Sequence, residues 1–119
     1  MEKLRLAVAT SEKDGLEDVV SKVFGRAKTF TIIDAEDEKI IDVTVVENPG
    51  LSYKYGAGPI VAKMMVDKHV DVVIAYVLGL GADELFNQHY IKHIAIKPNT
   101  KVETATREAL RILEKEGDT

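Results

Sequence analysis

The sequence contains no cysteine and no tryptophan. The lack of cysteine excludes disulfide bonds, zinc sites built on thiolates, iron-sulfur clusters held by protein thiolates, and cysteine nucleophiles. It also fits a protein that works in a reducing cytoplasm, which is the location we expect. Without thiolates, the bare protein is not expected to hold iron or zinc tightly.

Clustered positive charge and long apolar segments are also missing. Lysine and arginine number 16 against 20 acidic residues, which gives a net charge of −4 with no basic block. Binding to nucleic acid is therefore disfavoured, since it depends on concentrated positive charge. No apolar run approaches the roughly 20 residues that cross a bilayer, so we expect no membrane partner. The 119 residues, of which 45% are apolar, predict a single domain over residues 1–119.

The pattern of apolar residues predicts five strands and three longer helices. Alternating or β-branched runs indicate strands at residues 4–9, 29–34, 40–46, 70–76 and 93–96. Helical spacing indicates helices at 59–68, at 82–90 and after a capping-box sequence at 100–103. Residues 19–24 predict one or two further helical turns, ended by Gly25.

This order of elements predicts a three-layer α/β/α domain. The crossover helices return the fourth and fifth strands parallel to the first, so the five-stranded mixed sheet has the order 3-2-1-4-5 with strand 2 antiparallel. The loops at 10–28, 48–58 and 77–81 then all follow strands that point the same way. They meet at one rim of the sheet. The connections out of the first and fourth strands diverge there, and open α/β sheets bind ligands at such a topological switch point.

The rim loops carry two glycine pairs and several cations. Gly56 and Gly58 flank the start of a helix, and Gly79 and Gly81 follow a buried strand. Their backbone N–H groups could bind an anion, and close packing or tight turns explain the same glycines equally well. Arg26 and Lys54 add positive charge beside these loops, although a lone arginine is more often a solvated surface residue. Phe24 fits the core better than a ligand-stacking role.

Groups for metal binding or catalysis are scattered. His69 is expected at the edge opposite the rim, and His89 on the apolar face of its helix. His93 should begin the fifth strand near the lower edge. None of these histidines has zinc-site spacing, so we expect no metal site. The sequence shows no paired carboxylates and no serine with an aligned histidine, so we expect no catalytic residues.

Several sequence elements give the chain a family resemblance. They are the segments 6–10, 20–27, 46–49, 56–58 and 70–74, and the Gly79 that precedes Ala82. In this order they resemble the dinitrogenase iron-molybdenum cofactor biosynthesis family, which includes NifX-like proteins and the C-terminal domain of NifB. The resemblance implies a ribonuclease H-like fold and the binding or carriage of an iron-sulfur-type or iron-molybdenum-type cluster or its precursor.

The resemblance and the rim together define the expected cofactor-binding residues, which are Thr10, Ser11, Phe24, Gly25, Arg26, Lys54, Tyr55, Gly56, Gly58, Gly79 and Gly81. Val23 and Tyr55 stand where many relatives have histidine, so direct ligation of iron at the rim is not expected. A preassembled anionic cluster could instead be held by backbone N–H groups, Arg26 and lysines.

Three functions follow as hypotheses. The first is a non-enzymatic binding or carrier protein whose partner is an anionic metal cluster. The alternatives are a regulatory module that binds a protein partner, and an enzyme that acts on a small anionic metabolite at the same rim. The absence of catalytic pairs in the sequence favours the first two.

Overall fold

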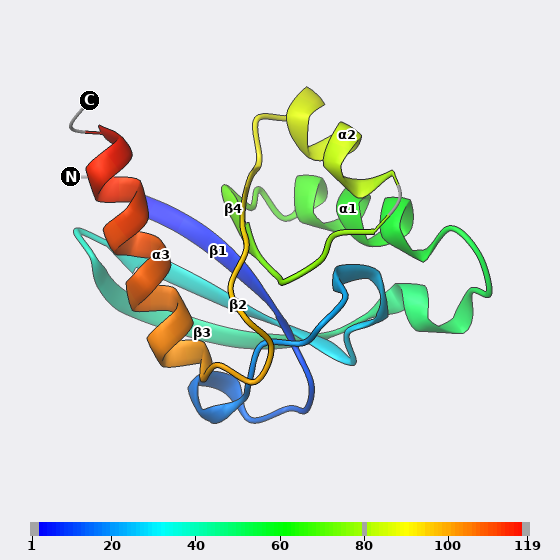
Figure 1. Cartoon of the computed structure of the whole chain (residues 1–119), viewed down its shortest axis with the longest axis horizontal. Coiled ribbons are helices and arrows are strands. Elements are labelled where there is room, and N and C mark those ends of the chain that lie inside the picture. The colour runs from blue at the N-terminus through cyan, green and yellow to red at the C-terminus, as the bar shows by residue number, and fades with distance from the viewer. Residues whose placement is uncertain (1–2, 80, 118–119) are drawn as a thin grey trace.

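The computed structural model describes residues 3–79 and 81–117, which form five strands and three α-helices (Figure 1). In chain order these elements are β1 (Lys3–Thr10), β2 (Thr29–Glu36), β3 (Lys39–Glu47), α1 (Ala57–Asp67), β4 (Val72–Ile74), α2 (Ala82–Gln88), β5 (Lys92–Ile94) and α3 (Val102–Gly117). Short 3-10 turns lie at Gly15–Glu17, Phe24–Arg26 and Pro49–Ser52.

The strands form one mixed sheet in the order β3-β2-β1-β4-β5. β2 runs antiparallel to β1 and β3, whereas β4 runs parallel to β1 and β5. The β2–β3 hairpin turns at Asp37 and Glu38, whose positive φ angles match the two-residue turns that such hairpins favour. The predicted strand order and the antiparallel second strand are confirmed.

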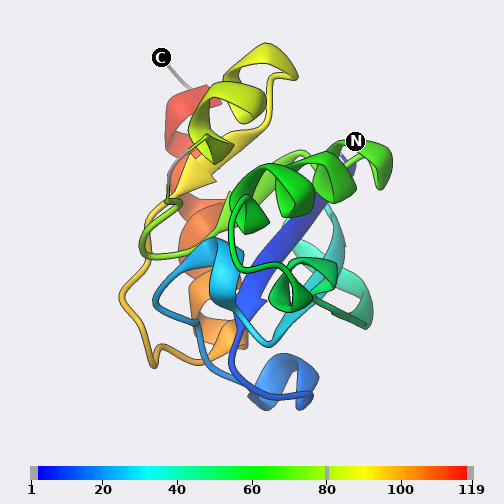
Figure 2. The same cartoon turned by 90° about the vertical axis from the view of Figure 1, so that its right-hand side faces the viewer.

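The side chains of β1 point alternately into two cores, because successive residues of a strand face opposite sides of the sheet. Leu6 and Val8 pack in the core beneath α3. Ala7 and Ala9 pack in the core beneath α1 and α2. Figures 1 and 2 show α1 and α2 on one face of the sheet and α3 on the other. The predicted three-layer α/β/α architecture is confirmed.

The predicted helical turns at residues 19–24 are wrong. Val19 and Val20 instead form extended bridges with Lys101 and Thr10, and Val23 bridges to Val77. Gly25 does not end a helix but lies within the 3-10 turn Phe24–Arg26. The β-branched valines find backbone partners far away in the sequence, and these partners override the local preference.

The last two strands are shorter than predicted, because the chain leaves the sheet early to meet the rim. After β4 ends at Ile74, the N–H of Val77 donates to the carbonyl of Lys22 at 3.0 Å. The fifth strand is Lys92–Ile94 and not residues 93–96. Within the described part of the chain, no helix has both the length and the apolar character needed to cross a membrane.

Candidate functional site

Three segments that lie far apart in the sequence meet at the carboxyl ends of β1, β3 and β4. The N–H of Phe24 donates to the carbonyl of Val77 at 2.8 Å, which joins the loop after β1 to the loop after β4. Arg26 joins the first of these loops to the segment between β3 and α1 through the carbonyls of Tyr53 and Lys54. The rim that the topology predicted is therefore one connected surface.

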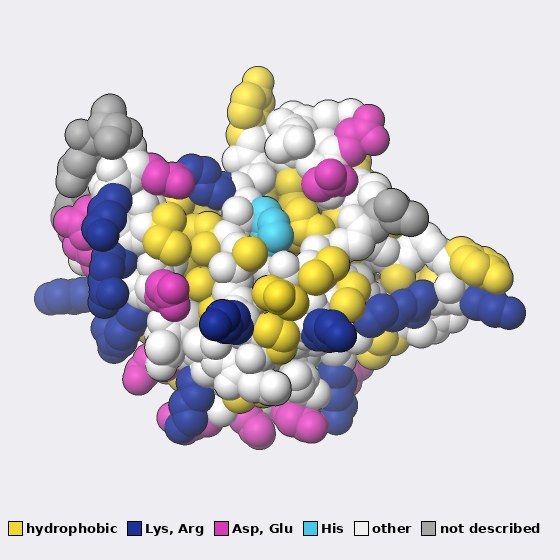
Figure 3. All heavy atoms as spheres, in the orientation of Figure 1, with side chains coloured by type: hydrophobic (Ala, Val, Ile, Leu, Met, Phe, Trp, Pro, Cys, Tyr) yellow, Lys and Arg dark blue, Asp and Glu magenta, His cyan; other side chains and the backbone are white. Residues whose placement is uncertain are grey.

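A hollow of about 280 Å³ opens on this surface, and we call it the rim hollow. It brings together most of the predicted residues from all three segments. Its lining consists of Val23, Gly25, Arg26, Lys54, Tyr55, Gly56, Ala57, Gly58, Pro59, Leu78 and Gly79. Figure 3 shows apolar side chains gathered on the middle of one face of the molecule, with several lysine and arginine side chains beside them.

Two glycines allow the walls of the rim hollow to approach closely. A Cβ atom added to Gly25 would lie only 3.2 Å from the backbone nitrogen of Gly58 and 3.3 Å from its Cα. Backbone atoms cannot move aside as a flexible side chain can. Close packing therefore explains the glycine at position 25, where the turn Phe24–Arg26 rests on the first turn of α1.

Other glycines serve backbone conformation. Gly56 precedes α1 with a φ of +77°, and Gly79 has a φ of +87°. A Cβ would meet no described atom within 4 Å at either position, so space does not demand glycine there. Positive φ does demand it, because L side chains rarely adopt this conformation.

The start of α1 gives the rim hollow a positive electrostatic character. The first N–H groups of a helix have no partner within the helix, and the helix dipole places partial positive charge at this end. Ala57 and Gly58 form the first turn of α1, and both line the rim hollow. This end of an 11-residue helix is therefore directed at the surface where Arg26 and Lys54 lie.

Arg26 has a structural role that sequence reasoning did not predict. Its two terminal nitrogens donate to the carbonyls of Tyr53 at 3.0 Å and Lys54 at 2.9 Å. A guanidinium group carries five N–H donors in a fixed plane, so these two bonds hold the side chain in place without using all of its donors. Arg26 is thus an immobilised cation at the edge of the rim hollow.

Lys54 and Tyr55 form the outer wall of the rim hollow. The ammonium group of Lys54 lies 5.7 Å from the centre of the Tyr55 ring, in a cation–π contact. Tyr55 is 80% exposed, so its ring is available to a molecule that enters the hollow. All four tyrosines of the chain are exposed, whereas all three phenylalanines are buried.

Four of the predicted residues do not line the rim hollow. Thr10 is fully buried, and its hydroxyl lies 2.6 Å from that of Thr29 on β2. Ser11 follows β1 and is not among the lining residues, and a Cβ atom added to Gly81 would lie 3.2 Å from the ring of Pro59. Phe24 is a core residue whose ring contacts Phe30 and Phe86, with centroids 5.2 and 5.3 Å away. It supports the hollow from below.

Four lining residues were missed by the sequence reasoning as binding residues. They are Val23, Ala57, Pro59 and Leu78. Each lies next to a predicted glycine or cation or one residue beyond it, so proximity to the glycine loops was the available signal. Their apolar side chains give the rim hollow a hydrophobic wall beside its two cations.

The positions predicted for His89 and His93 are wrong. His89 does not lie on an apolar face, because it follows the last residue of α2 and is exposed. His93 lies in the middle of β5, and its Nε2 is 2.8 Å from the carbonyl oxygen of Ala75, beyond the carboxyl end of β4. It therefore does not lie at the lower edge. Across the described residues, no three histidine, aspartate or glutamate side chains are grouped as a metal ion would require.

The fold and the rim define a class: small α/β/α proteins with a cationic, glycine-rich hollow at the switch point of the sheet. The chain belongs to the dinitrogenase iron-molybdenum cofactor family, whose model matches residues 4–111. A comparison with curated proteins finds no match.

Solved structures support this assignment. The apo form of the orange protein from Desulfovibrio gigas is 27% identical, with a TM-score of 0.78, and the match covers 93% of this chain and 88% of that one. A NifB candidate from Thermotoga is 31% identical, with a TM-score of 0.75 and coverage of 91% and 88%. A dinitrogenase candidate from Methanococcus jannaschii has a TM-score of 0.72 over 95% and 92% of the two chains, and at 15% identity it shows the shared fold alone.

Proposed function

We propose that this chain is a non-enzymatic carrier that holds an anionic iron-sulfur-type or iron-molybdenum-type cluster, or its precursor, in the rim hollow. The observation that carries the proposal is the composition of the hollow. It combines two cations, Arg26 and Lys54, with the start of α1, and no carboxylate is among its lining residues as described. Each of these features favours a negatively charged guest.

The apolar part of the lining suits a cluster better than a small, strongly hydrated anion. Val23, Leu78 and Pro59 offer surfaces that a hydrated phosphate would gain little by contacting. A cluster presents large, weakly hydrated sulfide faces, and Tyr55 and the valine and leucine side chains can pack against them. The guest would be held by charge, backbone N–H groups and contact area, without a covalent ligand from the protein.

The chemistry of the lining supports carriage over catalysis. The described lining residues include no histidine, aspartate or glutamate, the side chains that most often act as general acid or base. The rim hollow is thus equipped to hold and release a charged guest.

The test uses isolated iron-molybdenum cofactor and, separately, a synthetic [4Fe–4S] thiolate anion, both handled without oxygen. The parent protein should retain visible absorption and iron after gel filtration. Lys54→Ala should weaken binding by about threefold to tenfold. Lys63→Ala removes the same charge from the exposed side of α1, where Lys63 pairs with Asp67, and should bind as the parent does. Failure of the parent to retain either cluster, or equal loss in both variants, contradicts the proposal.

A further inference from the structure

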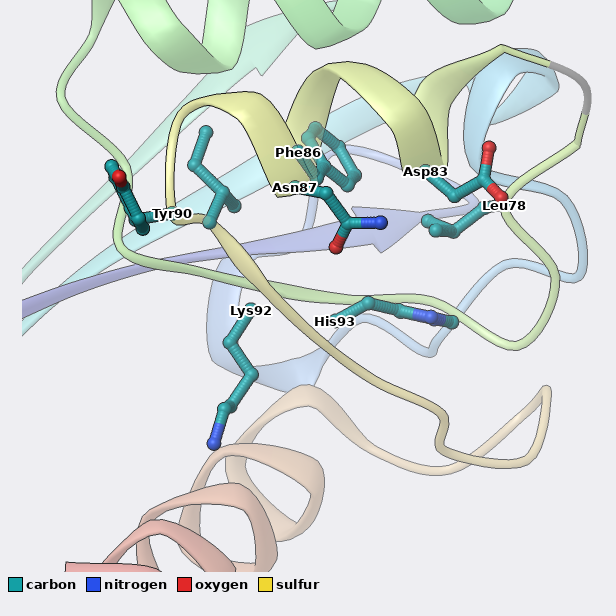
Figure 4. Close-up of a pocket in the computed structure, with 8 residues that line it drawn as sticks. Leu78, Asp83, Phe86, Asn87, Tyr90, Lys92 and His93 are labelled. Atoms are coloured by element: carbon teal, nitrogen blue, oxygen red, sulfur yellow. The ribbon is translucent and has the colours of Figure 1, made fainter.

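A second and larger hollow, of about 490 Å³, lies between α2 and the edge strand β5, and we call it the α2–β5 hollow. Its lining residues are Leu78, Asp83, Phe86, Asn87, Tyr90, Ile91, Lys92 and His93. Figure 4 shows Tyr90 at one end of the hollow and Leu78 with Asp83 at the other, while Lys92 points away toward α3. Among the described residues the hollow has Leu78 alone in common with the rim hollow, so it is a different surface.

Tyr90 occupies an unfavourable position. It follows α2 in a Schellman motif, in which Tyr90 N–H donates to Asn87 and Ile91 N–H donates to Phe86. Its φ is +58°, a conformation that normally selects glycine, and its side chain is 94% exposed. The chain thus keeps a large aromatic side chain where it strains the backbone and gains almost no burial. Tyrosine is among the residues enriched at protein–protein interfaces.

The strand beside Tyr90 is an open edge. Lys92 N–H donates to the carbonyl of Asp71, and Ala75 N–H donates to the carbonyl of Ile94, so residues 92 and 94 face β4. The backbone N–H and C=O of the residue between them, His93, therefore point away from the sheet. Two edge strands related by a two-fold axis can exchange a pair of hydrogen bonds at such a residue.

We propose that this face pairs two copies of the chain about a two-fold axis. The β5 edges meet antiparallel at His93, and Tyr90 of each copy enters the Leu78–Asp83 end of the other copy's α2–β5 hollow. A two-fold interface must be complementary to itself, and this face carries both a projecting side chain and a hollow to receive it. The phenol O–H of Tyr90 can donate to the Asp83 carboxylate of the second copy.

The charges are compatible with a second copy as the occupant. Among the described lining residues of the α2–β5 hollow the charged ones are Asp83 and Lys92, and Lys92 is paired with Glu116 of α3 within the same chain, so this face does not concentrate like charge as the rim hollow does. The rim hollow holds two cations and no lining carboxylate among the described residues, and two such surfaces would repel each other. The dimer therefore leaves both rim hollows open to solvent.

The test is sedimentation velocity over protein concentrations from about 10 µM to about 1 mM. The parent should shift from monomer to dimer across this range. Tyr90→Gly should raise the dissociation constant by at least about thirtyfold, as the loss of an aromatic interface anchor does. Asn87→Arg, which fills the hollow from the receiving side, should have a similar effect.

The matched control is His69→Gly. His69 ends α1 in the same Schellman geometry, with a φ of +58°, but lies outside the α2–β5 hollow. Both glycine variants should melt at a higher temperature than the parent in dilute solution, which shows that neither unfolds, and only Tyr90→Gly should lose the dimer. A parent that stays monomeric at about 1 mM overturns the proposal. So does a Tyr90→Gly variant that dimerises as the parent does, or a His69→Gly variant that dissociates to the same extent.

Discussion

The two hollows differ in how they are built, and the larger one is not the better anion site. The rim hollow is made of glycines, the start of α1 and two cations. The α2–β5 hollow is almost twice as large but has mixed charge and aromatic walls. In the two proposals, charge and exposed backbone, not volume, separate the hollow suited to an anionic guest from the surface suited to a second protein chain.

The two hollows nevertheless rest on one support. Phe24 belongs to the turn that lines the rim hollow, and Phe86 lines the α2–β5 hollow. Their rings meet edge to face with centroids 5.3 Å apart, and Phe30 of β2 packs against Phe24. The position of each hollow therefore depends on the same buried aromatic cluster.

The largest expected effect follows from this shared support. Phe24→Ala should lower the free energy of unfolding by about 3–5 kcal/mol, because it removes a fully buried ring and leaves a cavity. Tyr55→Ala is the matched aromatic control, and it should change stability by less than about 1 kcal/mol because its ring is largely exposed. Urea denaturation of both variants measures the difference. Similar losses in the two variants would mean that Phe24 is not the core residue described above.

Arg26 provides the second test, since it should separate the rim hollow from the rest of the surface. Arg26→Ala should weaken binding of the synthetic cluster anion by about 1.5–3 kcal/mol through the loss of a charge-assisted contact. Lys28→Ala removes a cation two residues away that is paired with Glu12, and should leave binding unchanged. Titration calorimetry without oxygen, with thermal melting as a check on folding, measures both. Unchanged binding in Arg26→Ala would remove this residue from the site.

Much of the fold and part of the rim could be predicted from the sequence. The strand order follows from the alternating apolar residues and from the crossover helices that return the fourth and fifth strands parallel to the first, and it places Gly25, Gly56 and Gly79 on one rim. Thr10 could not be placed correctly, because its burial depends on the register that sets its hydroxyl beside Thr29. The sequence predicts a strand over residues 4–9 with Thr10 opening the loop, whereas Thr10 is the last residue of β1, and no local pattern shows which residue lies opposite it.

Tyr90 illustrates a different limit. The residue that adopts the left-handed conformation after a helix is usually glycine or asparagine. A tyrosine at this position therefore gives no sign of that conformation in the sequence. The conformation arises because α2 must end and β5 must begin within a few residues, at the spacing that the sheet imposes. The α2–β5 hollow therefore cannot be read from the sequence, in which His93 is an isolated histidine without zinc-site spacing.

The third prediction concerns positive φ, which glycine adopts at Gly56 beside the rim hollow and tyrosine adopts at Tyr90 beside the α2–β5 hollow. Gly56→Ala should lower the free energy of unfolding by about 1 kcal/mol, because alanine is strained at a φ of +77° although space is available. Gly56→Asn should lose less, since asparagine tolerates this conformation better. Chemical denaturation compares the two. Equal losses would show that the backbone changes conformation on substitution, and that Gly56 is not needed for its positive φ.

The smallest expected effect concerns a third hollow, which serves as the acidic counterpart of the rim. Leu4, Leu110 and Leu113 line it together with Glu38 and Glu114. A hydrogen bond with Glu114, and repulsion from its charge, raise the pKa of Glu38 above its ordinary value of 4.5. Because the folded protein holds this proton more tightly than the unfolded chain, the stabilisation is complete below the ordinary pKa and is lost as the pH rises through the raised one.

Glu38→Gln removes this titration while keeping the size of the side chain. The variant should therefore melt slightly above the parent at neutral pH, and the difference should shrink as the pH falls below the ordinary glutamate pKa. Melting curves at a series of pH values measure it, with Glu103→Gln as the control, because Glu103 is an exposed carboxylate of α3 whose neighbour is Arg107. Removing that attraction should not raise the melting temperature. If Glu38→Gln melts below the parent at neutral pH, the two carboxylates do not repel each other, and this hollow is no electrostatic opposite of the rim.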